Sequence, residues 1–335
     1  MLAIAISDRP PSILISEHGM LPPSRGQSMF HRAVVSSPAT IANFGPGFDS
    51  FGLCLASPKD RISIRRLPAG RVELKILGKH KLPTNPEKNT ASYAAMKLAS
   101  LCGFEDVGFS MTIRKGMKPG SGIGSSAASS AGGAVAMAAL LGIGKRDIIL
   151  EAAAMGEELV AGSRHFDNVS AAIYGGFTVL SDLKTRTVIQ VRPPQFKIIV
   201  VIPEISIETR SAREILPKQV PLGDAVCNVG WASGMLHAMM KRNVRMIGKY
   251  LDDKLAVPFR SALIPGYDAV REAALSHGAF GVSVGGAGPA VFAIALDNGK
   301  TIKEAMALAF KSEAGLKSEA FVTVPGTGAK IESLS

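Results

Sequence analysis

The stretch Lys118-Pro-Gly-Ser-Gly-Ile-Gly-Ser-Ser-Ala-Ala-Ser-Ser130 joins a loop of glycine and serine directly to a predicted helix over residues 125–141. Sixteen of the twenty residues 121–140 are Gly, Ala or Ser. Glycine lets the loop turn its N–H groups toward a ligand, and the start of the helix adds the positive end of a dipole. The stretch therefore predicts an anion-binding site. A tight loop before a helix that packs closely on a sheet would have the same composition.

The loop matches neither of the usual phosphate fingerprints. Ser125 stands where GxGxxG needs its third glycine, and Ile294 stands where a Walker A sequence ending at residues 299–301 needs its first. A phosphate loop of a different kind is therefore required. A Cβ at Gly122 or Gly124 is expected to obstruct the approach of a phosphate.

Two further glycine-rich segments stand before and after this loop in the sequence. Pro38-Ala-Thr-Ile-Ala-Asn-Phe-Gly-Pro-Gly-Phe-Asp49 sets two polar residues among apolar ones, which indicates either a polar site or a bent loop whose Asn and Asp cap turns. Gly281-Val-Ser-Val-Gly-Gly-Ala-Gly-Pro-Ala-Val-Phe-Ala-Ile-Ala295 is a glycine loop between two predicted strands. This segment is equally compatible with a hairpin turn.

The periodicity of apolar residues predicts a mixed α+β chain in two lobes. The predicted strands are residues 33–36, 61–67, 72–77, 109–115, 176–182, 196–202, 281–284, 290–295 and 319–324. The predicted helices are residues 89–102, 125–141, 145–160, 211–216, 224–240, 267–276 and 300–312. Arg192-Pro193-Pro194 is the clearest break, so we expect an N-terminal domain over residues 29–191 and a C-terminal domain over residues 192–335.

Residues 1–28 differ from the rest of the chain. Their apolar run is too short for a signal peptide and no basic segment precedes it, while residues 10–28 are rich in Pro and Ser. We expect a disordered or non-native leader, with translation in the native host beginning at Met29.

Composition and charge restrict the possible partners. The 335 residues carry a net charge of +11, but the longest basic clusters are dipeptides and no aromatic residues are interleaved with them, so we expect no nucleic-acid partner. A phosphorylated small substrate such as a nucleotide would use the positive charge equally well. No apolar stretch reaches the ~18 residues of a membrane span, so no membrane partner is expected. Three separated cysteines suggest a reducing compartment, and we expect a cytoplasmic protein.

The three glycine-rich segments, in this order and at this spacing, resemble the GHMP kinase superfamily, named for galactokinase, homoserine kinase, mevalonate kinase and phosphomevalonate kinase. The first segment is similar to the pattern P-A-T-S-A-N-L-G-x-G-F-D-x-x-G of the homoserine kinase family, with Ile41 and Phe44 in place of Ser and Leu. His165-Phe-Asp-Asn-Val169 is a fourth match. Gly285 and Ile123 replace a usual Ser and Leu, and neither change removes a charged group. The resemblance implies an N-terminal ribosomal S5 domain 2-like lobe and a C-terminal ferredoxin-like lobe.

The resemblance implies that ATP binds along the glycine and serine loop and that Mg²⁺ accompanies it. The implied ATP contacts are Lys118, Pro119, Gly120, Ser121, Gly122, Ile123, Gly124, Ser125, Ser126, Ala127 and Ala128, with Gly286 and Gly288 from the third segment. Asn89 is expected to contact the adenine, although capping of the following helix would explain it as well. Ser126 and Glu157 match the positions of the magnesium ligands, and we favour Glu157 over its neighbour Glu158.

The implied acceptor is L-homoserine, phosphorylated on its side-chain hydroxyl in threonine biosynthesis. Its ammonium group calls for carboxylates and its carboxylate for arginines. The matching positions are Asn43, Asp49, Asp167, Arg210 and Arg260. Ser126, Glu157 and Asp167 are the expected catalytic residues. If Asp167 binds the ammonium group, no side-chain base is obvious.

Two alternatives remain open at this point. Another small-molecule kinase of the superfamily, such as a mevalonate-type enzyme, would share the phosphate contacts and differ in the acceptor pocket. A nucleic-acid-binding protein would share the S5-like lobe and bind RNA with a steep salt dependence. A homodimer is expected from the family alone.

Overall fold

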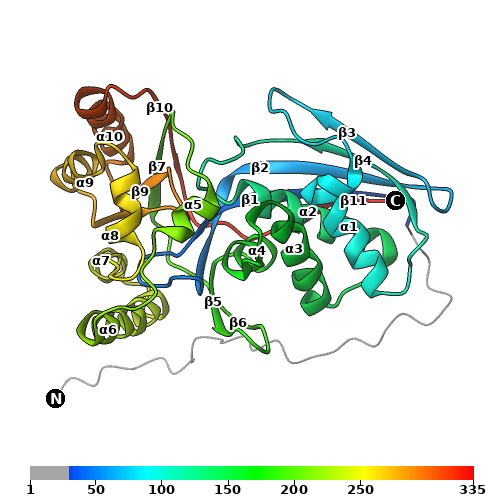
Figure 1. Ribbon diagram of the computed structural model, residues 1–335, viewed down its shortest axis with the longest axis horizontal. Helices are drawn as coiled ribbons and strands as arrows, with labels where there is room; N and C mark the ends of the chain where they lie inside the picture. Colours follow the sequence, from blue (N-terminus) through cyan, green and yellow to red (C-terminus); the bar gives the residue numbers. More distant parts are fainter. Residues whose placement is uncertain (1–29) are drawn as a thin grey trace, which may run out of the picture.

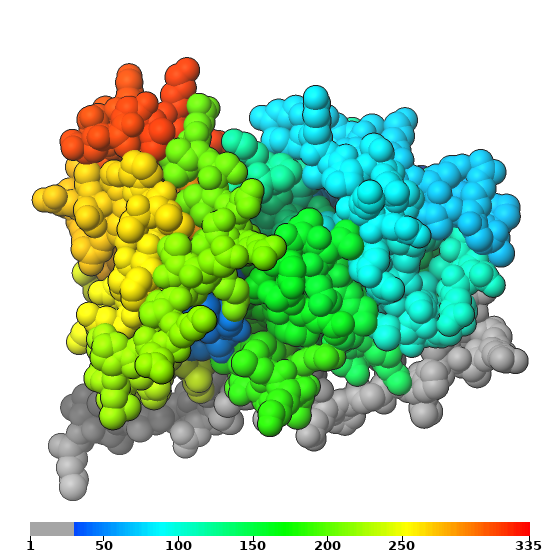
Figure 2. Space-filling model, viewed as in Figure 1, coloured from blue at the N-terminus to red at the C-terminus, as the bar shows by residue number. Residues whose placement is uncertain are grey.

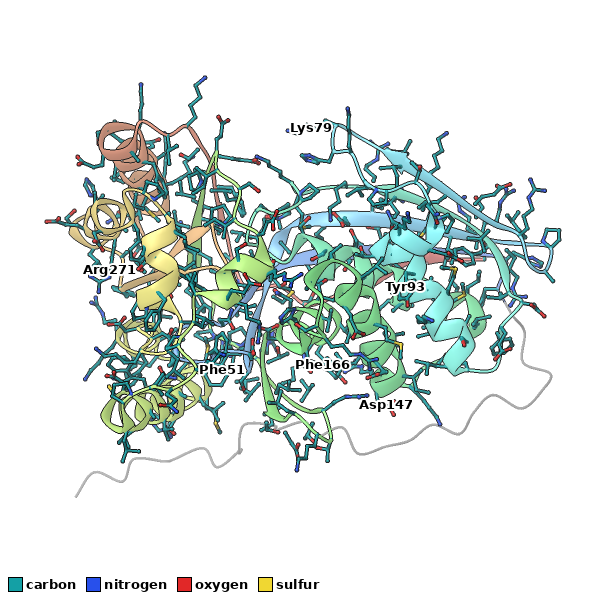
Figure 3. All side chains as sticks on the ribbon, in the orientation of Figure 1. Phe51, Lys79, Tyr93, Asp147, Phe166 and Arg271 are labelled. Atoms are coloured by element: carbon teal, nitrogen blue, oxygen red, sulfur yellow. The ribbon has the colours of Figure 1, made fainter. Side chains whose placement is uncertain are left out.

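The computed structural model describes residues 30–335, so the predicted leader over residues 1–28 lies outside the described part of the chain. Two lobes lie side by side along the long axis, one coloured mainly blue to green and the other lime to red (Figure 1). Arg271 lies at the outer end of the second lobe, whereas Tyr93 and Lys79 lie on the first (Figure 3). The prediction of a two-lobed α+β chain is confirmed.

A mixed seven-stranded sheet forms the centre of the first lobe. Its strands are β1 (Arg32–Ala42), β2 (Phe51–Leu67), β3 (Val72–Leu77), β4 (Gly108–Arg114), β5 (Phe177–Asp182), β6 (Thr187–Val191) and β11 (Lys330–Leu334). The order is β11-β1-β2-β4-β3, while β5 pairs with β2 and β6 pairs with β5. Only β3 and β4 pair in parallel. The last strand, β11, thus lies in the first sheet, although the sequence division assigns residues 330–334 to the second domain.

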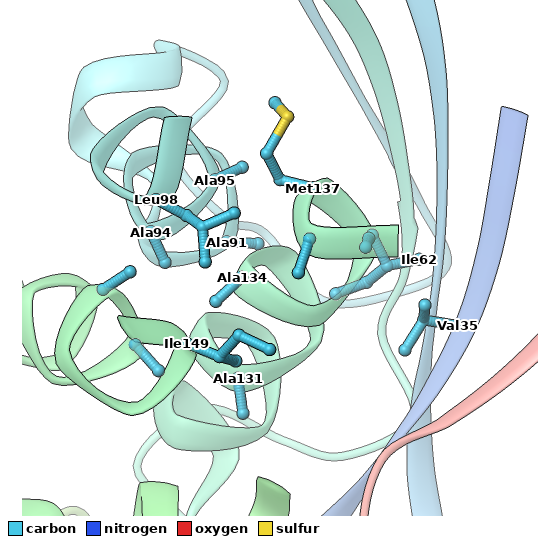
Figure 4. Packing of buried hydrophobic residues seen from close by; sticks show 14 of the residues in the cluster. Val35, Ile62, Ala91, Ala94, Ala95, Leu98, Ala131, Ala134, Met137 and Ile149 are labelled. Atoms are coloured by element: carbon cyan, nitrogen blue, oxygen red, sulfur yellow. The ribbon is translucent and has the colours of Figure 1, made fainter. Parts of the chain in front are cut away.

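Four helices cover this sheet in two layers, since α2 and α4 pack directly on its strands, while α1 and α3 pack on α2. They are α1 (Thr90–Leu101), α2 (Ser125–Leu141), α3 (Arg146–Ala161) and α4 (Phe166–Tyr174), and a short 3-10 helix, η1 (Pro86–Lys88), precedes α1. The small residues of α2 allow close contact on two sides (Figure 4). A Cβ at Gly133 would lie 2.0 Å from the Ala91 carbonyl oxygen, and one at Gly132 would lie 2.5 Å from the Ile62 side chain. The composition of α2 therefore reflects close packing as well as the loop that precedes it.

The second lobe is built on a four-stranded antiparallel sheet of order β10-β7-β9-β8. The strands are β7 (Lys197–Pro203), β8 (Gly281–Val284), β9 (Val291–Ala295) and β10 (Ser318–Thr323). The helices are α5 (Thr209–Glu214), α6 (Leu222–Met240), α7 (Val244–Lys249), α8 (Val257–Arg260), α9 (Tyr267–Ser276) and α10 (Gly299–Ala314), with the 3-10 helix η2 (Ser261–Leu263). One face of the sheet packs on α9 and α10 and the other on α6 and α7. The third glycine-rich segment is the β8–β9 hairpin, as one of the two sequence interpretations proposed.

A single apolar core joins the two lobes. Phe44 stacks on Phe292 of β9 with ring centroids 5.3 Å apart, and it meets the edge of Phe177 on β5 at 6.0 Å. Aromatic pairs of this kind add to the gain from burial. Phe44 is one of the two departures from the family pattern in the first glycine-rich segment, and its large ring bridges the lobes. The residues between them are therefore held in a fixed arrangement.

Every predicted helix and strand has a counterpart, and several observed elements were not predicted. These are β6, α4, α7, α8, β11 and the first ten residues of β2. The break at Arg192-Pro193-Pro194 falls between β6 and β7, and a domain division at this point stays a prediction. Within residues 30–335 no helix is both long and apolar enough to cross a membrane.

Candidate active site

A cavity of about 560 Å³ lies between the two lobes. The space-filling view shows this face hollowed between the lime surface around α5 and the cyan surface around β3 and α1 (Figure 2). Most of the predicted site residues line it: Asn43, Asp49, Asn89, Pro119, Gly120, Ser121, Gly122, Gly124, Ser125, Ser126, Glu157, Asp167, Arg210, Arg260, Gly286 and Gly288. The structure therefore brings together segments that lie up to about 240 residues apart in the sequence.

Four of the residues expected at ATP do not line this cavity. Ala127 and Ala128 are completely buried in the two cores that α2 touches. Ile123 is buried, and together with Lys118 it lines a smaller cavity of about 210 Å³ behind the loop. The side chains of these residues face away from the large cavity, so only their main chain remains available for an ATP contact.

The loop before α2 is held between β1 and the β8–β9 hairpin. Gly120, Gly122 and Gly124 all have left-handed backbone conformations, with φ of 69°, 78° and 63°. A Cβ at Gly122 would lie 2.7 Å from the Gly288 carbonyl oxygen, and one at Gly124 would lie 2.0 Å from Thr40 Oγ1. These two glycines are thus required by contacts within the protein, a reason the sequence did not suggest. Gly120 has no atom within 4 Å of its Cβ position and lines the cavity.

Ser126, in the first turn of α2, and Glu157, on α3, meet at the loop. Ser126 Oγ donates a hydrogen bond to Glu157 Oε1 at 2.7 Å. Glu157 Oε2 is buried and has no hydrogen-bond partner among the described residues. Burial raises the pKa of Glu157 to about 7, against the lowering effects of Ser126 and Lys115. The neighbouring Glu158 is exposed and pairs with Arg164, which agrees with the preference for Glu157.

These two residues fit a magnesium ion bound together with phosphates. Mg²⁺ prefers oxygen ligands, keeps several waters and usually takes only one or two protein ligands. A hydroxyl and a carboxylate with one unsatisfied oxygen supply that set at the helix start. Residues 30–335 contain no group of three or more His, Cys, Asp or Glu side chains that could hold a metal by themselves. An ion at this place would therefore depend on its phosphate ligands.

The opposite end of the cavity carries a cluster of charged side chains. Arg213 Nη2 donates to both carboxylate oxygens of Asp49, at 2.6 and 2.7 Å. Arg260 is buried and donates to the carbonyl oxygens of Ala212, at 3.2 Å, and Gly286, at 2.8 Å. Both guanidinium groups lie over the Phe48 ring. This pairing leaves Nε and Nη1 of Arg213 and Nη2 of Arg260 without a hydrogen bond among the described residues.

The two arginines of Glu208-Thr-Arg-Ser-Ala-Arg213 have different surroundings. Arg210, selected from the sequence, has a side chain that is 85% exposed and pairs with Glu214 on its own helix at 3.1 Å, so it reaches only the rim of the cavity. Arg213, three residues later, is the one that contacts Asp49. The sequence motif indicated the correct segment. It did not indicate which arginine faces the cavity, because both lie on the short helix α5 and differ only in their tertiary contacts.

Arg260 owes its position to the start of a short helix. The Asp253 carboxylate accepts hydrogen bonds from the Ala256 and Val257 amides at 2.6 and 2.7 Å. This cap satisfies N–H groups that a helix start leaves free. It fixes α8, which ends at Arg260.

Asp167 lies in the first turn of α4 and is buried. Its Oδ1 accepts a hydrogen bond from the Asn168 amide at 2.7 Å. Burial raises the pKa of Asp167 to about 7, and the nearby charge of Asp49 raises it further, while Arg260 opposes the rise. Asp167 is therefore a buried carboxyl group that forms no ion pair among the described residues.

Three other polar residues at the cavity are explained by local contacts. Asn43 Oδ1 accepts from the Asp49 amide at 2.8 Å and so closes the turn that presents Asp49. Asn89 caps α1 by accepting from the Ala91 amide and donates to the Pro83 carbonyl oxygen, so the capping alternative describes it. His165 also lines the cavity, and burial lowers its pKa. An adenine contact for Asn89 stays a prediction.

The sequence interpretation missed three residues besides Arg213. Asn168 lines the cavity and accepts a hydrogen bond from Thr40 Oγ1 at 2.7 Å. Lys115 also lines it and forms a buried ion pair with Asp60 at 2.6 Å. Asn168 stood within the quoted fourth motif, whereas no local pattern connects Asp60 with Lys115, 55 residues away.

Comparison with known proteins connects this geometry to one group of enzymes. The model of the GHMP kinases N terminal domain matches residues 89–176, and that of the GHMP kinases C terminal domain matches residues 235–312. The chain is similar to homoserine kinase of Pyrococcus furiosus, with 44% identity over 296 residues that cover 88% of this chain and 99% of the relative. Homoserine kinase of Thermococcus gammatolerans is 44% identical over 87% of this chain and 97% of its own.

Solved structures give the same grouping. The crystal structure of homoserine kinase from Cytophaga hutchinsonii matches with a TM-score of 0.83 and 34% identity over 91% of this chain and 99% of its own. The crystal structure of L. major mevalonate kinase in complex with R-mevalonate matches with a TM-score of 0.65 at 15% identity over 87% of this chain and 95% of its own. The second likeness shows a shared fold alone.

Proposed function

This chain belongs to the homoserine kinase family of the GHMP kinases, and we propose that the cavity between its lobes binds both of its substrates through the residues described above. The enzyme transfers a phosphoryl group from ATP to the side-chain hydroxyl of L-homoserine, a step of threonine biosynthesis that yields O-phospho-L-homoserine. Its lobes are the S5 domain 2-like and ferredoxin-like lobes of the GHMP kinase fold.

Asp167 and the two arginines support an amino-acid acceptor at one end of the cavity. Asp167 is a buried carboxyl group next to Asp49, and their mutual repulsion is relieved when a cation binds between them. The ammonium group of homoserine is such a cation. Arg213 uses only Nη2 for Asp49 among the described residues, and Arg260 uses Nε and Nη1 for main-chain oxygens, so guanidinium N–H groups of both remain for the carboxylate.

The loop before α2 supports the phosphates of ATP at the other end. Gly120, Ser121, Gly122 and Gly124 line the cavity directly before the first turn of α2. The amides of this turn and the helix dipole favour negative charge there. Ser121 Oγ and Ser125 Oγ are buried and have no partner among residues 30–335, so each has a hydrogen-bonding group to offer a ligand.

Ser126 and Glu157 would hold Mg²⁺ beside these phosphates. When bound, the ion neutralises charge on the phosphate oxygens during transfer. Glu157 Oε2 is the buried oxygen that lacks a partner, and ionisation of this carboxyl group requires a nearby cation because burial disfavours its charge.

Phosphoryl transfer then depends mainly on positioning. The hydroxyl oxygen of homoserine attacks the γ-phosphorus in line, the bond from this phosphorus to the bridging oxygen breaks so that ADP leaves, and the loop amides stabilise the charge on the γ-oxygens in a loose transition state. The hydroxyl proton passes to the transferred phosphoryl group or to water. Asp167 lies near both Glu157 and Arg260 and so stands between the phosphate end and the acceptor end of the cavity. We assign it to the ammonium group of the acceptor, an assignment under which no side chain acts as the base.

A coupled assay of ADP release tests this function. With L-homoserine we expect Mg²⁺-dependent release of ADP and a phosphomonoester product visible by ³¹P NMR. Release with mevalonate but not homoserine would favour the mevalonate-type alternative. RNA binding with a steep salt dependence, without any ADP release, would favour the nucleic-acid alternative.

We further propose that the enzyme is a cytoplasmic homodimer. The apolar residues Leu222, Val226 and Val229 recur along one side of α6 and are 80%, 64% and 67% exposed. A stripe of exposed apolar side chains on a helix whose other side is packed in the core is typical of a contact surface. A second copy of the chain is its proposed occupant. The cytoplasm supplies ATP and keeps thiols such as Cys54, Cys102 and Cys227 reduced.

A further inference from the structure

Lys115 and Asp60 form an ion pair that is almost completely removed from solvent. Lys115 Nζ lies 2.6 Å from Asp60 Oδ2, and the two side chains are 1% and 0% exposed. Lys115 directly follows β4, at the start of the loop, while Asp60 lies within β2. The pair is therefore located below the loop that we assign to the phosphates of ATP.

The hydrogen bonds of this pair reach both ends of the loop. Asp60 Oδ1 accepts from the Gly116 amide at 2.9 Å, where the loop begins. Lys115 Nζ donates to the Ser125 carbonyl oxygen at 2.5 Å, where the loop ends and α2 begins. Residues 116 and 125 are thus tied to one strand, β2, through two side chains.

Ser129 closes the network one turn further along α2. Lys115 Nζ donates to Ser129 Oγ at 2.9 Å, and Ser129 Oγ donates to Asp60 Oδ2 at 2.7 Å. An ammonium group has three donors, and those of Lys115 are taken up by Asp60, Ser125 and Ser129. Lys115 therefore has no donor left for a phosphate in this arrangement, although it lines the cavity.

A buried ion pair is not an efficient way to stabilise a fold. Apolar residues of similar volume are often as stabilising or more so, because removing two charges from water offsets most of their attraction. The pair is better explained by what its hydrogen bonds hold in place. A loop with three left-handed glycines has many conformations available, and fixing its two ends removes most of them.

We propose that Asp60 and Lys115 are positioning residues that hold both ends of the loop 116–124 and so keep it ready for the phosphates of ATP. The proposal rests on the proposed ATP site. Asp60 and Lys115 act through the loop and bind no substrate themselves.

The double variant Asp60→Asn/Lys115→Met tests this role. It removes both charges together, retains an amide oxygen for the Gly116 N–H group, and releases the Ser125 carbonyl oxygen. We expect a melting temperature close to that of the parent, whereas Lys115→Met alone should melt lower because it leaves a buried carboxylate without its cation. The KM for ATP should rise about tenfold or more, because ordering even one loop residue when ATP binds costs about a factor of ten in affinity. The KM for homoserine should change less than twofold.

Hydrogen exchange of the unliganded protein separates this proposal from the assignment of function. Amides 117–124 should exchange faster in the double variant than in the parent, and this readout requires no catalysis. Unchanged exchange together with an unchanged KM for ATP would overturn the proposal, even if homoserine is phosphorylated. Faster exchange would support it even if the parent phosphorylates another acceptor.

Adjacent serines provide a matched pair if the double variant does not fold. Ser129→Ala breaks the network, whereas Ser130→Ala breaks only a hydrogen bond from the neighbouring buried hydroxyl to the Ala153 carbonyl oxygen on α3. We expect faster loop exchange and a higher KM for ATP in Ser129→Ala only. Equal effects of the two substitutions would mean that Asp60 and Lys115 serve the fold alone.

Discussion

Asp167 couples the proposed function to the stability of the unliganded enzyme. Its carboxyl group is buried next to Asp49, and its pKa of about 7 lies about three units above that of an ordinary aspartate. The folded protein therefore holds a proton that the unfolded chain releases at much lower pH. The proposed binding of the ammonium group requires an ionised Asp167 carboxylate. In the unliganded protein the same buried negative charge lowers the free energy of unfolding.

Asp167→Asn should reduce the loss of stability that accompanies a rise from acidic to neutral pH. The raised pKa means that the folded state loses stability as pH increases from about 4 to about 7, at about 1.4 kcal/mol per unit. Between pH 5 and pH 8 the parent should lose about 3 kcal/mol more unfolding free energy than the variant. Denaturant unfolding at both pH values, without ligands, measures the difference. Parallel losses would show that Asp167 is not protonated in the folded protein.

Arg213→Ala should damage the acceptor site, whereas Arg210→Ala should not. Removing Arg213 leaves Asp49 without its partner in a partly buried site, which costs about 2–5 kcal/mol and lowers kcat/KM for homoserine roughly 30- to several-thousand-fold. The exposed pair of Arg210 and Glu214 is worth only about 0.3–0.5 kcal/mol, so its loss should change kcat/KM about twofold at most. Steady-state kinetics of both variants provides the comparison. The reverse order of effects would restore Arg210 as the acceptor arginine.

The sequence indicated most individual residues of the site because the motifs are local. Asp49, Glu157, Asp167 and Arg260 all line the cavity, as expected. Arg213 was missed because it shares a short helix with Arg210. The partners Asp60 and Lys115 could not be inferred, since their contact depends on the pairing of β2 with β4.

At the level of elements, α2 was predicted with its observed limits. The glycine before it, Gly124, adopts a left-handed conformation, and Gly142 ends it in the same way. By contrast, β6 and β11 were missed because short edge strands gain stability only from a partner strand elsewhere in the chain. The early part of β2 is not an edge, since it pairs with both β1 and β5, but these partners also lie elsewhere in the chain.

Gly124→Ala should destabilise the protein more than Gly120→Ala. Both positions have a left-handed conformation that costs an alanine about 1 kcal/mol or more. Only at Gly124 does the added Cβ meet a neighbour, 2.0 Å from Thr40 Oγ1, whereas at Gly120 it points into open space. Thermal unfolding of the two variants should therefore show a clearly lower melting temperature for Gly124→Ala. Equal melting temperatures would mean that the loop is not packed against β1 as described.

On the scale of the whole molecule, the relation of the two lobes was only partly visible in the sequence. Two lobes were predicted from the sequence. Arg192-Pro193-Pro194 lies between β6 of the first sheet and β7 of the second. Their common core around Phe44 and the return of β11 to the first sheet could not be read from local patterns. Both features tie the lobes together around the cavity.

The exposed side of α6 predicts the state of association. The parent should have twice the mass of the chain by light scattering, and Val226→Glu should reduce it to a single chain because a buried charge would stand in the contact. Leu308→Glu is the control, since Leu308 on α10 is 63% exposed but lies on another surface. A parent with the mass of one chain, or a Val226→Glu variant that stays dimeric, would contradict this assignment.

The proposed function requires that one cavity brings ATP together with an amino acid whose ammonium and carboxylate groups are both bound. Steady-state kinetics of the parent enzyme with L-homoserine and with 4-hydroxybutyrate, which lacks the amine, tests it most directly. The analogue leaves Asp167 without its cation in a buried site, and unpaired polar groups of this kind can reduce efficiency by several orders of magnitude. We expect a kcat/KM for homoserine at least about a hundredfold higher than that for 4-hydroxybutyrate, with the same KM for ATP. Equal efficiency with the two acceptors would contradict an amino-acid site.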